Sequence, residues 1–155
     1  MTPKNILVAT DLSDNSVPAL RLACALAAPL GAQVTLAYVL EPTPTPPGLE
    51  AFAMEGLPMD WEYRLHQGRS EAANRRMEEL QKQVADSGCT VTSKLVLGRL
   101  PEALVEEAQN MKADLLVVGT HGRKGVSHLL LGSVAERLVR TAHCPVLVVR
   151  PEAAQ

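Results

Sequence analysis

Residues 114–133 read DLLVVGTHGRKGVSHLLLGS, an apolar run followed by a glycine-rich segment and a Gly-Ser pair. The continuous Leu/Val run predicts a strand buried on both faces, as the strands of parallel sheets are. A helical pattern follows the Gly-Ser pair and extends to Ala142. A strand, a glycine-rich connection and a helix form one βα unit, so this stretch predicts an α/β fold.

The rest of the chain repeats this alternation. We expect strands at residues 4–10, 33–40, 90–97, 114–119 and 145–150, and helices at 13–30, at 60–87, from Pro101 onward and at 133–142. Ser13 or Asp14 is the expected cap of the first helix, and Gly31 is its expected end. A proline-rich loop occupies residues 41–59. The pattern predicts a mostly parallel sheet covered on both faces, within a single domain over residues 1–155.

Charge and composition argue against several classes of function. The formal net charge of −2 argues against non-specific nucleic-acid binding. Residues 22–40 carry no charge, but Pro29 and Gly31 interrupt them and the hydrophobic period changes there, so a helix and a strand are expected rather than a membrane span. The cysteines are odd in number and far apart, and no signal-peptide pattern opens the chain. These features favour a cytoplasmic protein with reduced thiols and no membrane or nucleic-acid partner.

Polar and glycine residues follow two of the predicted strands. In open parallel sheets, ligands bind beyond the carboxyl ends of the strands, where the strand order reverses. Thr10 and Asp11 come directly after the first strand, and Gly119 and Gly122 come at and after the end of the fourth. We interpret Asp11 as a site carboxylate, with a cap at the entry to the following helix as the alternative.

The connection after the fourth strand has the chemistry of a phosphate site. Glycines let backbone N–H groups approach a ligand closely, and a helix that begins near Gly132 and Ser133 offers N–H donors and a partial positive charge. Arg123 and Lys124 would add positive charge. Two alternatives remain. Ser133 only caps its helix, through a capping box with Glu136, or the glycines only turn the chain.

The glycine spacing of residues 119–133, Gly-x2-Gly-x9-Gly-Ser, is neither a P-loop nor the dinucleotide fingerprint. It resembles the ATP-binding signature of the universal stress protein family. Residues 6–13, ILVATDLS, are similar to the first strand and the Asp-x-Ser turn of that family, and residues 114–119 and 144–149 are similar to its last two strands. The resemblance covers nearly the whole chain.

This resemblance implies a Rossmann-like fold of the adenine nucleotide alpha hydrolase-like type, with a five-stranded parallel sheet in the order 3-2-1-4-5. The ligand that it implies is ATP, or AMP or ADP, with Mg²⁺ as a candidate companion ion. By matched positions, Asp11 would lie against the adenosine, and the main chain at Val39 would meet the adenine edge. The groups expected around ribose and phosphates are Gly119, Gly122, Gly132, Ser133 and the N–H of Val134. We add Thr10, beside Asp11, and Arg123, whose phosphate contact is inferred from its charge and position.

Among the classes of function, an ATP-binding regulatory protein of the stress response is favoured. Phosphoryl transfer at enzyme rates needs a positioned water, a metal and a charge clamp. Asp11 is a candidate magnesium ligand, but no general base can be assigned. No catalytic residue and no protein metal site are therefore predicted, and slow ATP hydrolysis at the same site is the alternative. A phospho-receiver domain would need an Asp after the middle strand, and a flavodoxin-like carrier expects aromatic residues that are scarce here.

The last strand carries a prediction about assembly. In the implied order it lies at an edge of the sheet, beginning at Pro145 and ending at Arg150. An apolar edge invites pairing with another chain, and the flanking Pro145 and Pro151 limit that pairing to a few residues, which favours a closed two-fold dimer. Members of the family commonly dimerise through this strand. We expect a homodimer through residues 145–150, with a monomer whose edge is covered by the loop 41–59 as the alternative.

Overall fold

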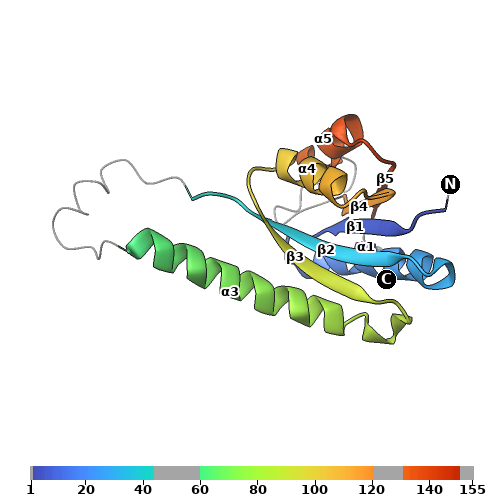
Figure 1. Ribbon diagram of the computed structural model, residues 1–155, viewed down its shortest axis with the longest axis horizontal. Helices are drawn as coiled ribbons and strands as arrows, with labels where there is room; N and C mark the ends of the chain where they lie inside the picture. Colours follow the sequence, from blue (N-terminus) through green and yellow to red (C-terminus); the bar gives the residue numbers. More distant parts are fainter. Residues whose placement is uncertain (1, 44–59, 121–130, 151–155) are drawn as a thin grey trace.

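The sheet is built from the five apolar runs that the sequence predicts as strands (Figure 1). The computed structural model describes residues 2–43, 60–120 and 131–150. The strands are β1 (Asn5–Ala9), β2 (Gln33–Leu40), β3 (Val91–Leu97), β4 (Leu115–Gly119) and β5 (Val146–Val149). All neighbouring strands are parallel, in the order β3-β2-β1-β4-β5. The predicted fold class and strand order are confirmed.

Helices cover both faces of the sheet. They are α1 (Val17–Ala27), α3 (Trp61–Lys82), α4 (Glu102–Asn110) and α5 (Ser133–Thr141), with short 3-10 helices η1 (Asp14–Ser16), η2 (Ala28–Leu30) and η3 (Ala85–Ser87). The first helical segment ends as predicted at Gly31, whose φ of 61° is a left-handed conformation that glycine adopts at little cost. The predicted cap is wrong in part: Ser13 precedes η1 without a capping bond from its side chain, and Ser16 holds the cap position of α1. In the described ranges, no helix is both long and apolar enough to span a bilayer.

The central strand β1 shows why its sequence is apolar at almost every position. Ile6 and Val8 pack with α1 and α3 in one half of the core, whereas Leu7 and Ala9 pack with α4 and α5 in the other half. All four side chains are buried, because successive residues of a strand point to opposite faces. β1 is therefore enclosed on both faces by helices.

The central strand also ends before its neighbours do. The last residues of β1 to pair are Ala9, opposite Ala37 of β2, and Val8, opposite Val117 of β4. Both neighbouring strands run on past these positions. The carboxyl edge of the sheet therefore has a step at β1. This step lies where the strand order reverses, which is where open α/β sheets bind their ligands.

At the amino ends of the strands, the side chain of Asp114 links β1 to β4. Its Oδ2 accepts hydrogen bonds from the backbone N–H groups of Lys4, at 2.8 Å, and Asn5, at 3.0 Å. These bonds join the start of β1 to the residue before β4. They also hold the pKa of the Asp114 carboxyl below its usual value, because they favour the charged form.

Asp114→Asn should remove a pH-dependent part of the stability. Because the folded-state pKa lies below the unfolded value of ~3.9, the carboxylate stabilises the fold above that pH. This contribution is lost as the pH falls through the folded-state pKa. Urea unfolding should show the wild type more stable than the variant at neutral pH, with the difference shrinking in acid. A difference that does not change with pH would contradict this role of Asp114.

Candidate functional site

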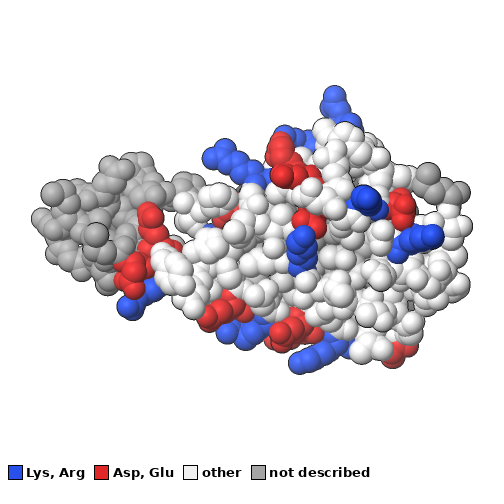
Figure 2. Space-filling view, viewed as in Figure 1, with Lys and Arg blue, Asp and Glu red and all other residues white. Residues whose placement is uncertain are grey.

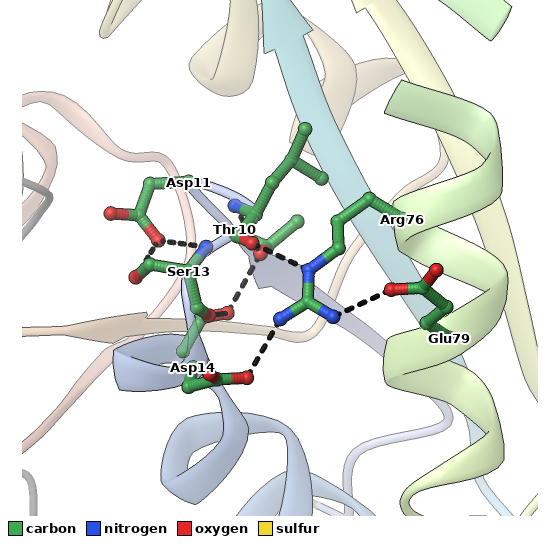
Figure 3. Close-up of polar contacts among 8 residues, drawn as sticks. Thr10, Asp11, Ser13, Asp14, Arg76 and Glu79 are labelled. Carbon is green, nitrogen blue, oxygen red and sulfur yellow. Dashed lines mark hydrogen bonds and ion pairs between the residues drawn. The ribbon is translucent and has the colours of Figure 1, made fainter. Parts of the chain in front are cut away.

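The loop between β1 and α1, residues 10–16, is held by a chain of hydrogen bonds (Figure 3). Oγ1 of Thr10 accepts the N–H of Leu12 at 2.9 Å and lies 2.8 Å from Oγ of Ser16. Since the Ser16 hydroxyl donates to the carbonyl of Ser13 at 2.7 Å, the Thr10 hydroxyl is the donor to Ser16. Thr10 and Ser16 are buried, so the loop has a small polar core of its own.

Asp11 lies at the end of β1, and Ser13 fixes the orientation of its carboxylate. Oδ1 of Asp11 accepts the N–H of Ser13 at 3.0 Å and its hydroxyl at 2.6 Å. The first of these bonds closes an Asx turn, a local motif that satisfies loop backbone. The hydroxyl of Ser13 therefore orients Asp11 and does not cap a helix, which corrects the expectation for Ser13.

Leu12 takes a left-handed backbone conformation, with a φ of 67°. For a residue with a side chain this costs of order 1–2 kcal/mol, so surrounding contacts must hold it in place. Its N–H is bonded to Thr10, and its carbonyl accepts a hydrogen bond from Nε of Arg76 in α3 at 3.0 Å. Nothing in the sequence pattern points to Arg76, because the two residues lie 64 positions apart and α3 is predicted from its apolar face.

β2 presents the backbone of Val39 beside the end of β1. The N–H of Thr10 donates to the carbonyl of Ala37 at 2.9 Å, so Ala37 faces β1. Alternate residues of a strand face the same neighbour, and Val39 therefore directs its N–H and C=O to the β1 side, beyond the point where β1 ends. The other set of alternate residues in β2 faces β3. Leu40 belongs to this set, and its carbonyl accepts the N–H of Gly98, the residue that follows β3.

Gly132 brings the start of α5 against the end of β4. Its N–H donates to the carbonyl of Thr120, one residue past β4, at 2.9 Å. A Cβ at position 132 would lie 2.9 Å from that same oxygen, closer than Cβ contacts in real proteins, so this approach needs glycine. Gly132 is also the N-cap of α5, and the N–H of Glu136 bonds to its carbonyl. Ser133 is thus the first helical residue, and the capping-box alternative for it is wrong.

Several of the predicted residues come together at the carboxyl ends of β1, β2 and β4. Gly119 is the last residue of β4, and the first-turn N–H groups of Ser133 and Val134 have no acceptor earlier in their own helix. Gly122 and Arg123, with the neighbouring Lys124, lie outside the described residues. Within the described ranges, no three His, Cys, Asp or Glu side chains gather as a metal site would require.

Comparisons with known proteins identify the family and the fold. The family model described as the universal stress protein family matches residues 2–150. Universal stress protein MJ0531 of Methanocaldococcus jannaschii is 34% identical over 148 residues, which cover 95% of this chain and 82% of that protein. The solved structure of MJ0577, from the same organism, has a TM-score of 0.78 and 28% identity, and the match covers 99% of this chain and 100% of that one. A universal stress protein solved in complex with cAMP has a TM-score of 0.65 and 28% identity, over 96% of this chain and 98% of that one.

Gly132→Ala should destabilise the fold by about 1–3 kcal/mol, because the added Cβ forces the end of β4 and the start of α5 apart. Gly68→Ala is the matched control. Position 68 is in α3, where a Cβ would meet nothing within 4 Å. That change should stabilise by about 0.5–1 kcal/mol, since alanine loses less backbone entropy in a helix. Urea unfolding measures the free energy of unfolding of both variants. If the two substitutions change it in the same direction, the contact with Thr120 does not require glycine at position 132.

Proposed function

The chain belongs to the universal stress protein family, and from this premise we propose that it binds an adenine nucleotide, ATP, at the carboxyl ends of β1, β2 and β4. The observation that carries this proposal is the early end of the central strand. It leaves the carboxylate of Asp11, the backbone of Val39 and the start of α5 around one step in the sheet. The similar structure that holds cAMP supports adenine nucleotides as the class of ligand.

Each part of an adenine nucleotide has a complementary group in this arrangement. The amino group of adenine is a donor and its ring nitrogens are acceptors, which matches the C=O and N–H of Val39. Ribose hydroxyls donate to carboxylates, the role proposed for Asp11. The phosphates suit the N–H groups and the partial positive charge at the start of α5. The proposed contacts are Thr10, Asp11, Val39, Gly119, Gly132, Ser133 and Val134, together with Gly122 and Arg123 outside the described residues.

The setting of Asp11 favours binding over turnover. Its Oδ1 accepts two hydrogen bonds from Ser13, which fix the orientation of the carboxylate for contact with a ribose, and we assign no general base. We therefore infer a regulatory role in the stress response, in which occupancy of the site is the signal. Mg²⁺ would enter with the phosphates of magnesium-ATP, since the described side chains form no three-ligand cluster.

The charge on the face drawn in Figure 2 is consistent with a small-molecule ligand rather than a nucleic acid. Figure 2 shows acidic and basic side chains of the described residues interspersed on one face, and both signs occur along α3. Proteins that bind nucleic acids present a basic patch or stripe instead.

A cytoplasmic location is part of the proposal, because an odd number of widely spaced cysteines favours reduced thiols. Cys24, Cys89 and Cys144 are free. Burial, with the neighbouring Cys24, raises the pKa of Cys89 to about 11. Burial, with the nearby charge of Asp114, also raises the pKa of Cys144. These two thiols stay protonated at neutral pH and are poor nucleophiles.

Homodimerisation through β5 is a further part of the proposal. Among the described residues, no strand pairs with the outer edge of β5. β5 bonds to β4 through the carbonyls of Pro145 and Val149, so the alternate residues Val146 and Val148 direct their N–H and C=O groups away from β4. The side chains of β5 are half-buried in the single chain. A second copy of β5 could use the outward groups and cover these side chains.

Ser133→Asp is the sharpest test of the nucleotide site. An Asp in the first turn of a helix stabilises it by about 0.3–1 kcal/mol, so the fold should be retained. Its charge should repel the phosphates and weaken the binding of magnesium-ATP by about tenfold or more. Gln109→Glu adds the same charge at an exposed position of α4 and should bind as the wild type does. Calorimetry compares the three proteins, and the site is refuted if the wild type does not bind or if both variants bind equally.

Val148→Pro should weaken the dimer and leave the sheet intact. It removes one outward N–H of β5 and none of the bonds to β4, and proline is tolerated at such edge positions. Light scattering at high micromolar concentration measures the mass of wild type and variant, with circular dichroism as the folding control. A monomeric wild type, or a folded variant that stays fully dimeric, would exclude this edge as the interface.

A further inference from the structure

Arg76 of α3 uses all three nitrogens of its guanidinium group between the helix and the β1–α1 loop (Figure 3). Nε donates to the carbonyl of Leu12 at 3.0 Å, Nη2 to Oδ1 of Asp14 at 2.7 Å, and Nη1 to Oε2 of Glu79 at 2.7 Å. The side chain of Arg76 is 29% exposed, whereas those of Asp14 and Glu79 are 81% and 58% exposed. The guanidinium plane is thus fixed at three points.

The ion pairs and the backbone bond of Arg76 have different roles. Pairs with exposed carboxylates add little stability, so their main effect is to orient the planar group. Once oriented, Nε meets the carbonyl of Leu12, which is the residue in the left-handed conformation. A hydrogen bond from a charged donor is stronger than a neutral one. Arg76 therefore acts on the backbone of the residue next to Asp11.

Apolar side chains attach α3 to the sheet. Met77 and Leu80, on the same helix, are fully buried in the half of the core that contains α1. Their burial supplies the free energy that holds the helix in place. The bond from Arg76 to a loop carbonyl adds little to this packing, whereas the conformation of Leu12 needs a partner for its carbonyl.

We propose that Arg76 is a positioning residue for nucleotide binding: it holds Leu12 in its left-handed conformation and so keeps the carboxylate of Asp11 in place at the end of β1. This role rests on the proposed nucleotide function. The hydrogen bond from Arg76 to Leu12, which fixes the loop, forms without a ligand. With Leu12 fixed at its N–H by Thr10 and at its carbonyl by Arg76, Ser13 follows at the position where its N–H and hydroxyl reach Asp11.

Arg76→Gln tests this role, and Arg75→Gln is the matched control. Arg75 is the adjacent residue on the same helix, is exposed, and loses the same charge. Amide hydrogen exchange at Leu12 and Ser13, measured by NMR without ligand, reports on the loop. Calorimetry reports the affinity for magnesium-ATP. In Arg76→Gln, loop exchange should rise and affinity should fall, each by about tenfold or more. Exchange within α3 and the urea midpoint should match those of Arg75→Gln, which should behave as the wild type.

Arg76→Lys keeps the positive charge at position 76 and removes the planar guanidinium group, so it separates the effect of geometry from that of charge. A lysine ammonium is a point charge and lacks the planar fork, so it should not hold the three acceptors together. We expect it to resemble Arg76→Gln in both readouts. Wild-type behaviour of Arg76→Lys would show that charge alone suffices and would overturn the fixed-fork argument.

The remaining outcomes are distinct. Unchanged loop exchange in Arg76→Gln overturns the hold on Leu12. Faster loop exchange with unchanged affinity overturns the positioning role, and a uniform rise in exchange across the sheet shows general destabilisation and overturns it as well. If the wild type binds no magnesium-ATP, the proposed function fails and the positioning role fails with it, while loop exchange still decides whether Arg76 holds the loop.

Discussion

The early end of β1 is the constraint on which the carboxyl edge of this sheet depends. If β1 ran as far as its neighbours, its backbone would pair with Val39 on one side and with the end of β4 on the other. Instead the chain turns away at Thr10, and the buried hydroxyls of Thr10 and Ser16 bond to the loop in place of a strand partner. The step that results leaves Val39 past the last pair that β2 makes with β1, while the loop bonds satisfy the end of β1.

Side chains of α3 hold two of the loops around this step. Arg76 bonds to the loop after β1, and Arg69, two helical turns earlier, donates to the carbonyl of Glu41 at 3.1 Å and to the hydroxyl of Thr43, both after β2. The carboxylate of Glu41 in turn accepts the N–H of Leu100, in the connection after β3, at 3.0 Å. Hydrogen bonds thus join three loops that are distant in sequence, all at the carboxyl ends of the strands. A core packed by apolar contacts alone would leave their relative positions less defined, because such contacts are non-directional.

Local patterns predicted the strands well, because burial on both faces leaves continuous apolar runs such as residues 115–118. They also located Gly132, although the reason that glycine is needed, the close approach to Thr120, is visible only in the structure. The polar contacts are harder to predict from the sequence. The hydroxyl of Ser13 had two plausible local partners, a helix N-terminus and Asp11, and sequence spacing does not choose between them. Arg76 was missed because a bond across 64 residues leaves no local trace.

The two edge strands of the sheet differ in charge, and the difference bears on the proposal that β5 pairs with a second copy. On β3, Lys94 bonds through Nζ to Oε1 of Glu107 in α4 at 2.6 Å, and Glu107 is only 7% exposed. Charged side chains that point inward from an edge strand discourage pairing, because a new strand would have to bury the charge. β5 carries no charge along Val146–Val149. It also lies near the proposed phosphate end of the site: the carbonyl of Val149 accepts the N–H of Thr120, whose own carbonyl accepts the N–H of Gly132. The edge proposed for assembly and the helix start proposed for phosphate binding therefore belong to one hydrogen-bonded segment of backbone.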